Sequence, residues 1–121
     1  MNAAVLTGAG RTLLVPLWCR ARCALLYPGL GVGEDDALLL RRLRADFSQA
    51  LRADCALYAL RELFIRRAAE GYLALRPGAA VIDLGCGLDT LARRLPGSGA
   101  RIYADLPEVI ELRRELLPPG P

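Results

Sequence analysis

The sequence contains no histidine and no lysine, and only 6% of its 121 residues are aromatic. All sixteen basic residues are therefore arginines, which we attribute mainly to coding bias. Four cysteines are present without any CxxC spacing: Cys19, Cys23, Cys55 and Cys86. With no histidine, a zinc site would have to be assembled from scattered thiolates. We therefore expect no metal site, and a location in the reducing cytoplasm.

Long uncharged stretches are also missing. No run reaches the roughly eighteen apolar residues that a membrane span requires. The apolar segment "TLLVPLWCRARCALLYPG" is interrupted by Arg20 and Arg22, and it lacks the basic region and clean cleavage site of a signal peptide. A net charge of +3 on scattered arginines argues against nucleic acid as a partner. We interpret the arginine doublets as solvated helix faces: Arg41-Arg42, Arg66-Arg67, Arg93-Arg94 and Arg113-Arg114.

An apolar fraction of 54% and this length indicate one folded domain. Helical spacing dominates residues 1–76, where we predict helices over residues 12–27, 34–45 and 53–75. Pro16 either kinks the first helix or marks its late start. The segment "PGLGVG" separates the first two helices, and "DFS" interrupts or recaps the second.

The third predicted helix has a regular apolar face. Its members recur at steps of three and four residues: Leu57, Leu60, Phe64, Ala68 and Tyr72. Arg61 lies beside this face. Either its aliphatic part packs at the edge of the core while its charged group reaches solvent, or its guanidinium contacts a buried anion.

The helical spacing of apolar residues ends at residue 78. "AAVIDLG" at 79–85 is a short β-branched run, which predicts a strand buried on both faces. A helix over 88–95, a turn at 96–99, a strand over 100–105 and a helix over 107–117 follow. Strand, helix, strand and helix in succession predict an α/β fold with a doubly wound parallel sheet, of which only two strands are present.

The turn after the first strand reads "LGCGLDT". Gly85 and Gly87 there allow a ligand close to the backbone, and Asp105 follows about twenty residues on, where an acid can accept hydrogen bonds from a ribose. Thr90 stands where a dinucleotide fold has its third glycine, and nearby aspartates disfavour a pyrophosphate. The loop therefore favours a nucleoside ligand with positive charge, such as S-adenosylmethionine. A tight turn that binds nothing remains an alternative.

Two segments, "VIDLGCGLDTLARRL" and "RIYADLPEVIELRRELL", resemble the leucine carboxyl methyltransferase family of class I S-adenosylmethionine-dependent methyltransferases, which includes bacterial polyketide-associated members. In that family the loop reads LGxGxDT, and the next strand ends in DxP. "TLLVPLWCRAR", "DFS" and "ALRELFI" extend the resemblance over most of residues 12–118.

The resemblance implies a Rossmann-like fold and S-adenosyl-L-methionine as cofactor. It also implies that six residues bind the cofactor: Arg61, Gly85, Cys86, Gly87, Asp105 and Leu106. Arg61 would contact the carboxylate of the cofactor or of the substrate, and Asp105 the ribose. Many members have an acidic or amide residue where this chain has Tyr103, so part of the ribose contact is expected to differ.

The expected reaction is methylation of an oxygen on a small molecule or peptide. A carboxylate acceptor needs no general base, whereas a hydroxyl would, and no base or other catalytic residue is evident in the sequence. We expect residues 1–76 to form a helical region and 77–121 to begin a cofactor-binding domain that lacks the family's further strands. On this interpretation the chain is an inactive methyltransferase fragment. The alternatives are a non-catalytic helical and βαβ interaction module, or another nucleotide-binding enzyme.

Overall fold

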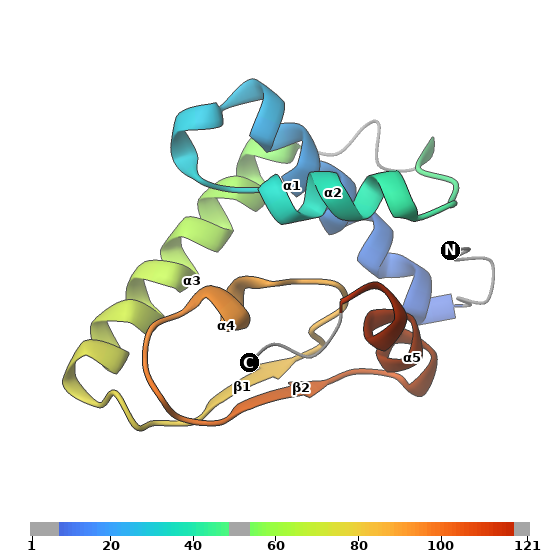
Figure 1. Cartoon of the computed structure of the whole chain (residues 1–121). Helices are drawn as coiled ribbons and strands as arrows, with labels where there is room; N and C mark the ends of the chain where they lie inside the picture. Colours follow the sequence, from blue (N-terminus) through green and yellow to red (C-terminus); the bar gives the residue numbers. More distant parts are fainter. Residues whose placement is uncertain (1–7, 49–53, 118–121) are drawn as a thin grey trace.

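The computed structural model describes residues 8–48 and 54–117. Figure 1 shows helices α1 and α2 together at one end, α3 along one flank, and the two strands with α4 and α5 opposite them. The elements, in chain order, are η2 (Gly8–Leu13), α1 (Leu14–Leu26), η3 (Pro28–Leu30), α2 (Glu34–Arg42), α3 (Cys55–Leu75), β1 (Val81–Leu84), α4 (Leu91–Arg94), β2 (Arg101–Ala104) and α5 (Pro107–Leu116).

The two strands form a parallel pair. Val81 lies opposite Arg101 and Leu84 opposite Ala104, with α4 in the crossover connection. This arrangement confirms the predicted strand–helix–strand unit and is a partial α/β fold. Because the strands are parallel, both carboxyl ends lie at one edge of the sheet, where Gly85 and Asp105 follow them.

Three apolar clusters hold the helices around that edge. The largest joins α1, α2, α5 and the loop after β1 through Leu14, Leu17, Leu39, Leu43, Leu88, Val109, Leu112 and Leu116. A second joins α1 to α3 through Cys23, Val32 and Ala59, and a third joins α3 to α4 through Leu73, Leu91 and Leu95. Burial of these side chains is the main force that places the N-terminal helices beside the strand ends.

Helices α1 and α2 are also joined by a buried ion pair. The Nε of Arg20 donates to Asp36 Oδ1 at 2.9 Å, and Nη2 of the same arginine lies 2.8 Å from that oxygen. Gly33, at φ +87°, permits this approach, since a Cβ there would clash with the carbonyl oxygen of Arg20. Only glycine fits at this crossing.

Helix boundaries differ in places from the prediction. Pro16 lies in the first turn of α1, after the 3-10 segment η2, so the late start is confirmed. Helix α2 ends at Arg42 rather than residue 45, because Leu43 is extended and its side chain is buried in the main cluster. Helix α3 begins at Cys55 after Asp54, whose Oδ1 accepts from the Leu57 N–H; the predicted start at residue 53 lies outside the described residues.

The helix predicted over residues 88–95 is much shorter. Helix α4 comprises only Leu91–Arg94. The Asp89 Oδ1 accepts from the Leu91 N–H at 2.9 Å, and the Thr90 hydroxyl donates to Asp35 Oδ2 at 2.9 Å. These polar contacts hold residues 88–90 in a turn, since aspartate and threonine side chains compete with helical hydrogen bonding.

Two predicted apolar surfaces are not buried as expected. The first strand was predicted to be covered on both faces, but Ile82 is 59% exposed and Leu84 78% exposed. The predicted face of α3 is also largely exposed, and Phe64 is 79% exposed. The opposite side of α3, which carries Ala59 and Leu73, is the side that packs. Among the described residues, the helices cover one face of the sheet only, which explains the alternating burial of β1.

The interpretation of the arginine doublets as solvated is partly wrong. Arg41, Arg67 and Arg114 are exposed as expected. Arg113 is only 6% exposed, because it follows Val109 by four residues and therefore lies on the buried face of α5. Arg94 is exposed as expected, although its Nη2 also bonds Glu62 Oε1 at 3.1 Å and so ties α4 to α3.

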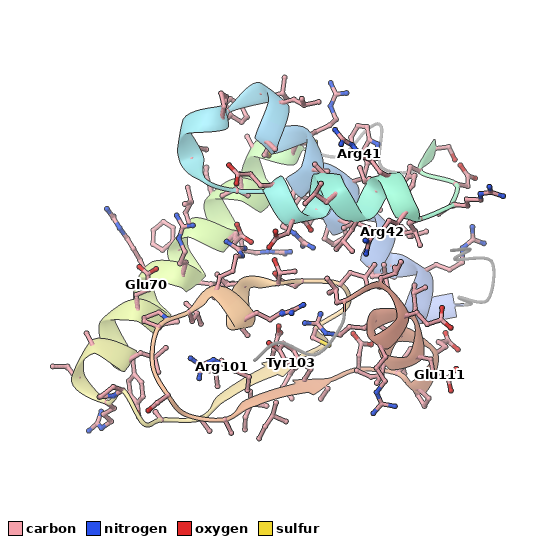
Figure 2. All side chains as sticks on the ribbon, viewed as in Figure 1. Arg41, Arg42, Glu70, Arg101, Tyr103 and Glu111 are labelled. Carbon is pink, nitrogen blue, oxygen red and sulfur yellow. The ribbon has the colours of Figure 1, made fainter. Side chains whose placement is uncertain are left out.

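The side chains of β2 divide between two environments. Figure 2 shows Arg101 and Tyr103 on the same side of the strand, toward the space enclosed by α4 and α5, while Ile102 between them is exposed. Arg101 donates to four carbonyl oxygens of the α4–β2 region and thereby fixes that connection. No helix formed by residues 8–48 and 54–117 has the length and apolar character needed to cross a membrane.

Candidate functional site

A cavity of about 390 Å³ lies at the carboxyl ends of the two strands. The sequence predicted six cofactor-binding residues, and the structure places all of them on its wall: Arg61, Gly85, Cys86, Gly87, Asp105 and Leu106. They come from α3, from the loop after β1 and from the segment after β2. The volume lies within the range of small-molecule sites.

The loop of residues 85–90, here called the glycine loop, forms one wall of this cavity. Gly85 has φ +65° and Gly87 φ +51°, which is the left-handed region that glycine adopts without strain. The N–H groups of Gly85 and Cys86 both donate to the Ala104 carbonyl, which ties the start of the loop to the end of β2. A Cβ added at Gly85 would meet no atom within 4 Å, so the backbone there borders open space.

Asp105 connects the glycine loop to the second strand end. Its Oδ2 accepts from the Gly87 N–H at 2.8 Å, and its Oδ1 accepts from the Leu106 N–H at 2.7 Å. A carboxylate has about four acceptor positions, so two remain for hydroxyl donors of a ligand. Asp105 therefore holds the loop and can still bind a diol.

Arg61 stands across the cavity from α3. Its guanidinium lies over the ring of Tyr58, 4.8 Å from the centroid, and the residue is exposed. It lines the first cavity and also a second one of about 480 Å³ between α3, β1 and α4. An exposed arginine at the junction of two cavities is available to an anionic group of a ligand.

The second cavity adjoins the first and is more acidic. Both are lined by Arg20, Arg61, Gly85 and Asp89. Asp83 and Glu62 join Asp89 on the second wall. Glu62 is 5% exposed, and its Oε2 has no hydrogen-bond partner among the described residues. Asp83 and Asp89 therefore provide the more accessible acceptors of this wall for a cationic or hydrogen-donating ligand.

Burial shifts the ionisation of these acids. The pKa of Asp83 is raised from 3.8 to about 6, chiefly because burial disfavours its charge and secondly because Asp89 is nearby. The pKa of Glu62 is raised by burial, against the opposing attraction of Arg94. Burial also raises the pKa of Cys86, so its thiol is held neutral on the cavity wall.

The raised pKa of Asp83 predicts a stability that depends on pH. Its folded pKa of about 6 exceeds the unfolded value of 3.8, so its favourable contribution is full below about pH 4 and is lost as the pH rises through 6. With allowance for residual exposure, we expect a loss of about 1–2 kcal/mol. Asp83→Asn should reduce the pH dependence by this amount and be more stable than the parent at pH 7, as measured by thermal unfolding at pH 4 and 7; Glu62 and Asp36, whose pKa values are also raised by burial, retain their part of it.

Glu70→Gln is the matched control, because Glu70 is exposed on the outer side of α3, as Figure 2 shows. It should leave the pH dependence of the unfolding temperature unchanged. Equal pH profiles for Asp83→Asn and the parent would contradict the assignment.

Sequence reasoning missed several polar residues around the cavities. Arg20 lines both of them, and Arg113 contacts the glycine loop from α5. The signal for Arg113 was its spacing of four residues from Val109, on the same helix face as Leu112 and Leu116. For Arg20 the only signal was its interruption of an apolar helix.

The replacement of the family's acidic residue by Tyr103 also has a structural counterpart. The Tyr103 ring lies against the Arg113 guanidinium, 4.1 Å from the centroid, rather than at the cavity wall. Within the described part of the chain, no group of three or more cysteine or acidic side chains is placed to bind a metal ion.

Two curated proteins are similar to this chain. It is 38% identical over 120 residues to the tetracenomycin polyketide synthesis O-methyltransferase TcmP of Streptomyces glaucescens, a match that covers 93% of this chain and 43% of TcmP. It is 33% identical over 125 residues to the S-adenosyl-L-methionine-dependent methyltransferase dpfgK of Gibberella zeae, over 93% of this chain and 42% of that protein. The chain thus spans less than half the length of these relatives. No family model and no solved structure matches it.

Proposed function

We propose that this chain forms the cofactor-binding part of an S-adenosyl-L-methionine-dependent O-methyltransferase. The observation that carries the proposal is the convergence of Arg61, the glycine loop and Asp105 on one cavity at the strand ends. The similarity to two methyltransferases over 93% of the chain supports it. The quoted motifs favour the leucine carboxyl methyltransferase family within this class.

The residues around the cavity fit the chemical groups of this cofactor. Asp105 retains acceptor positions for the ribose hydroxyls, and the bare backbone at Gly85 leaves space for a close approach. Arg61 suits the carboxylate of the amino-acid end, while Asp83 and Asp89 suit a cationic group. When bound, the cofactor would supply an activated methyl group on a positively charged sulfur, to be transferred to an acceptor oxygen with a neutral thioether as the leaving group.

The acceptor is an oxygen of a small molecule or peptide. A carboxylate is already ionised and requires only positioning and removal of water. A hydroxyl requires a base, and Asp83 is the best placed acid for this role, since it lines the second cavity and its pKa of about 6 lets it accept a proton near neutral pH. The structure therefore adds a candidate base that the sequence did not indicate.

We further propose that the chain is inactive by itself and that further strands complete the site. The described sheet consists of β1 and β2 alone, so each has an unpaired outer edge, and unpaired edges favour pairing with further strands. Ile82, Leu84 and Ile102 also form an exposed apolar face of this sheet. Relatives more than twice as long provide the length for such strands. Replacing the matched part of TcmP with this chain should yield an active chimera, whereas the chain alone should not transfer methyl groups.

Binding is tested on the 121-residue chain by NMR titration, which detects weak complexes. We expect S-adenosyl-L-methionine to shift the amide signals of Gly85, Gly87 and Leu106, and NAD to leave them unchanged. Shifts with NAD only would indicate another nucleotide-binding enzyme. An absence of shifts with both ligands, in a folded chain, would favour the interaction module.

The role of Arg61 is tested with ligands that differ in one group. Arg61→Met should weaken S-adenosyl-L-methionine binding about fivefold, the effect of a partly solvated charged hydrogen bond. Binding of 5′-methylthioadenosine, which has no carboxylate, should not change. Arg67→Met on the same helix is the control, because Arg67 is exposed and lines neither cavity. Equal weakening of both ligands would exclude carboxylate recognition by Arg61.

A further inference from the structure

Arg113 is a buried cation on α5 that contacts the glycine loop. Its Nη1 donates to the Asp89 carbonyl at 2.7 Å and to the Gly87 carbonyl at 3.1 Å. The residue is 6% exposed. Hydrogen bonds from a charged donor to carbonyl oxygens are stronger than neutral ones, so this pair of contacts restrains the backbone at both positions.

No carboxylate of residues 8–48 and 54–117 bonds Arg113. Within the described residues it forms no ion pair, and its guanidinium instead lies over the Tyr103 ring at 4.1 Å. The aromatic face attracts the cation and limits its rotation. The side chain is thus placed by β2 and α5, and its hydrogen-bonding capacity is directed at the loop.

The loop needs such restraint because it contains two glycines at positive φ. Glycine has more accessible backbone conformations than other residues, so this segment would sample several conformations if it were untied. Asp105 binds the Gly87 N–H, and Arg113 binds the Gly87 carbonyl. The peptide groups on both sides of Gly87 are therefore held, one by an anion and the other by a cation.

We propose that Arg113 is a positioning residue that holds the glycine loop in the conformation that binds the cofactor. This inference rests on the proposed function, and it assigns to α5 a role in binding although Arg113 itself does not line the cavity. A residue that merely fills the core would stabilise the whole fold. A positioning residue affects the loop selectively.

Amide hydrogen exchange, measured by NMR on the full chain, separates these two roles. Arg113→Met should accelerate exchange at Gly87 at least about tenfold, because two charged hydrogen bonds are lost. Exchange at Ala59 and Leu73, in the two clusters that contain no residue of α5 or of the glycine loop, should change less than twofold. Arg113→Lys keeps the charge but not the planar guanidinium with its several donors, so it should accelerate exchange at Gly87 by an intermediate factor.

Two further variants keep the test decisive. Arg114→Met, at the adjacent exposed position, should leave Gly87 exchange unchanged. If Arg113→Met does not fold, Tyr103→Leu takes its place in the test, because it removes the ring that contacts Arg113 but retains an apolar side chain. It should accelerate exchange at Gly87 selectively, by a smaller factor than Arg113→Met. Uniform acceleration at all amides, or an unchanged rate at Gly87, would overturn the proposal.

Cofactor binding provides the second measurement. In the NMR titration, Arg113→Met should weaken S-adenosyl-L-methionine at least fivefold, and Arg114→Met should not. A loosened loop with unchanged affinity would contradict a role in binding. If the parent chain showed no binding, the proposed function would fail. The exchange rates would still decide separately whether Arg113 holds the loop.

Discussion

Asp36→Ala should destabilise the fold by about 3–5 kcal/mol, which is the usual cost of leaving one member of a buried ion pair without its partner. Arg20 would remain buried at the α1–α2 crossing without the carboxylate that bonds it, since the pair is nearly enclosed. Domains of this size are stable by only about 5–15 kcal/mol, so the loss is a large fraction of the total. Thermal or urea unfolding of the variant and the parent measures it.

Glu34→Ala is the matched control for Asp36→Ala, because it removes an exposed acid from the same first turn of α2. It should cost well under about 1 kcal/mol. The double variant Arg20→Met with Asp36→Leu should recover most of the stability, since an apolar pair avoids the desolvation of two charges. A loss for Asp36→Ala no larger than that of Glu34→Ala would show that the pair is not important for the fold.

Asp105→Ala should weaken S-adenosyl-L-methionine binding by roughly 1–3 kcal/mol, because it removes acceptors for the ribose and leaves buried donors unpaired. It also releases the Gly87 N–H and therefore one side of the glycine loop. In the NMR titration this corresponds to a loss of about 5- to 150-fold in affinity. Adenosine binding should weaken as well, whereas methionine, which has no ribose, should be unaffected.

Glu111→Ala serves as the control for Asp105→Ala. Glu111 is an exposed acid on α5, as Figure 2 shows, and it lines neither cavity. Its removal changes the net charge equally but should leave the affinity unchanged. If Asp105→Ala lowered the affinity less than twofold, the assignment of Asp105 to the ribose would be wrong.

Asp105 and Arg113 both restrain the glycine loop from the C-terminal part of the described chain. Asp105 lies between β2 and α5, and Arg113 belongs to α5. Both contact Gly87 through its peptide groups. Variants at these positions should therefore couple in binding, because they restrain the same residue.

The local features of the site could be predicted from the sequence. The strand–loop–helix pattern, the glycines at 85 and 87 and the acid at 105 are consecutive or spaced by one βαβ unit, and parallel strands necessarily bring their carboxyl ends together. Arg61 was predicted by resemblance to a family motif, and the structure places it on the same cavity. The burial of Arg113 followed in principle from helical spacing, although the doublet concealed which arginine faces inward.

What the sequence by itself determined was the order of helices and strands, the glycine turn and the residues that gather at it, since these depend on neighbours in the chain. The tertiary structure decided which side of α3 packs, how little of residues 88–95 is helical, and that Arg20, Glu62 and Arg113 are buried. Those outcomes depend on partners distant in the sequence: Asp36, Arg94 and the loop carbonyls. A charged side chain is buried only where such partners offset its desolvation, and periodicity alone does not contain that information.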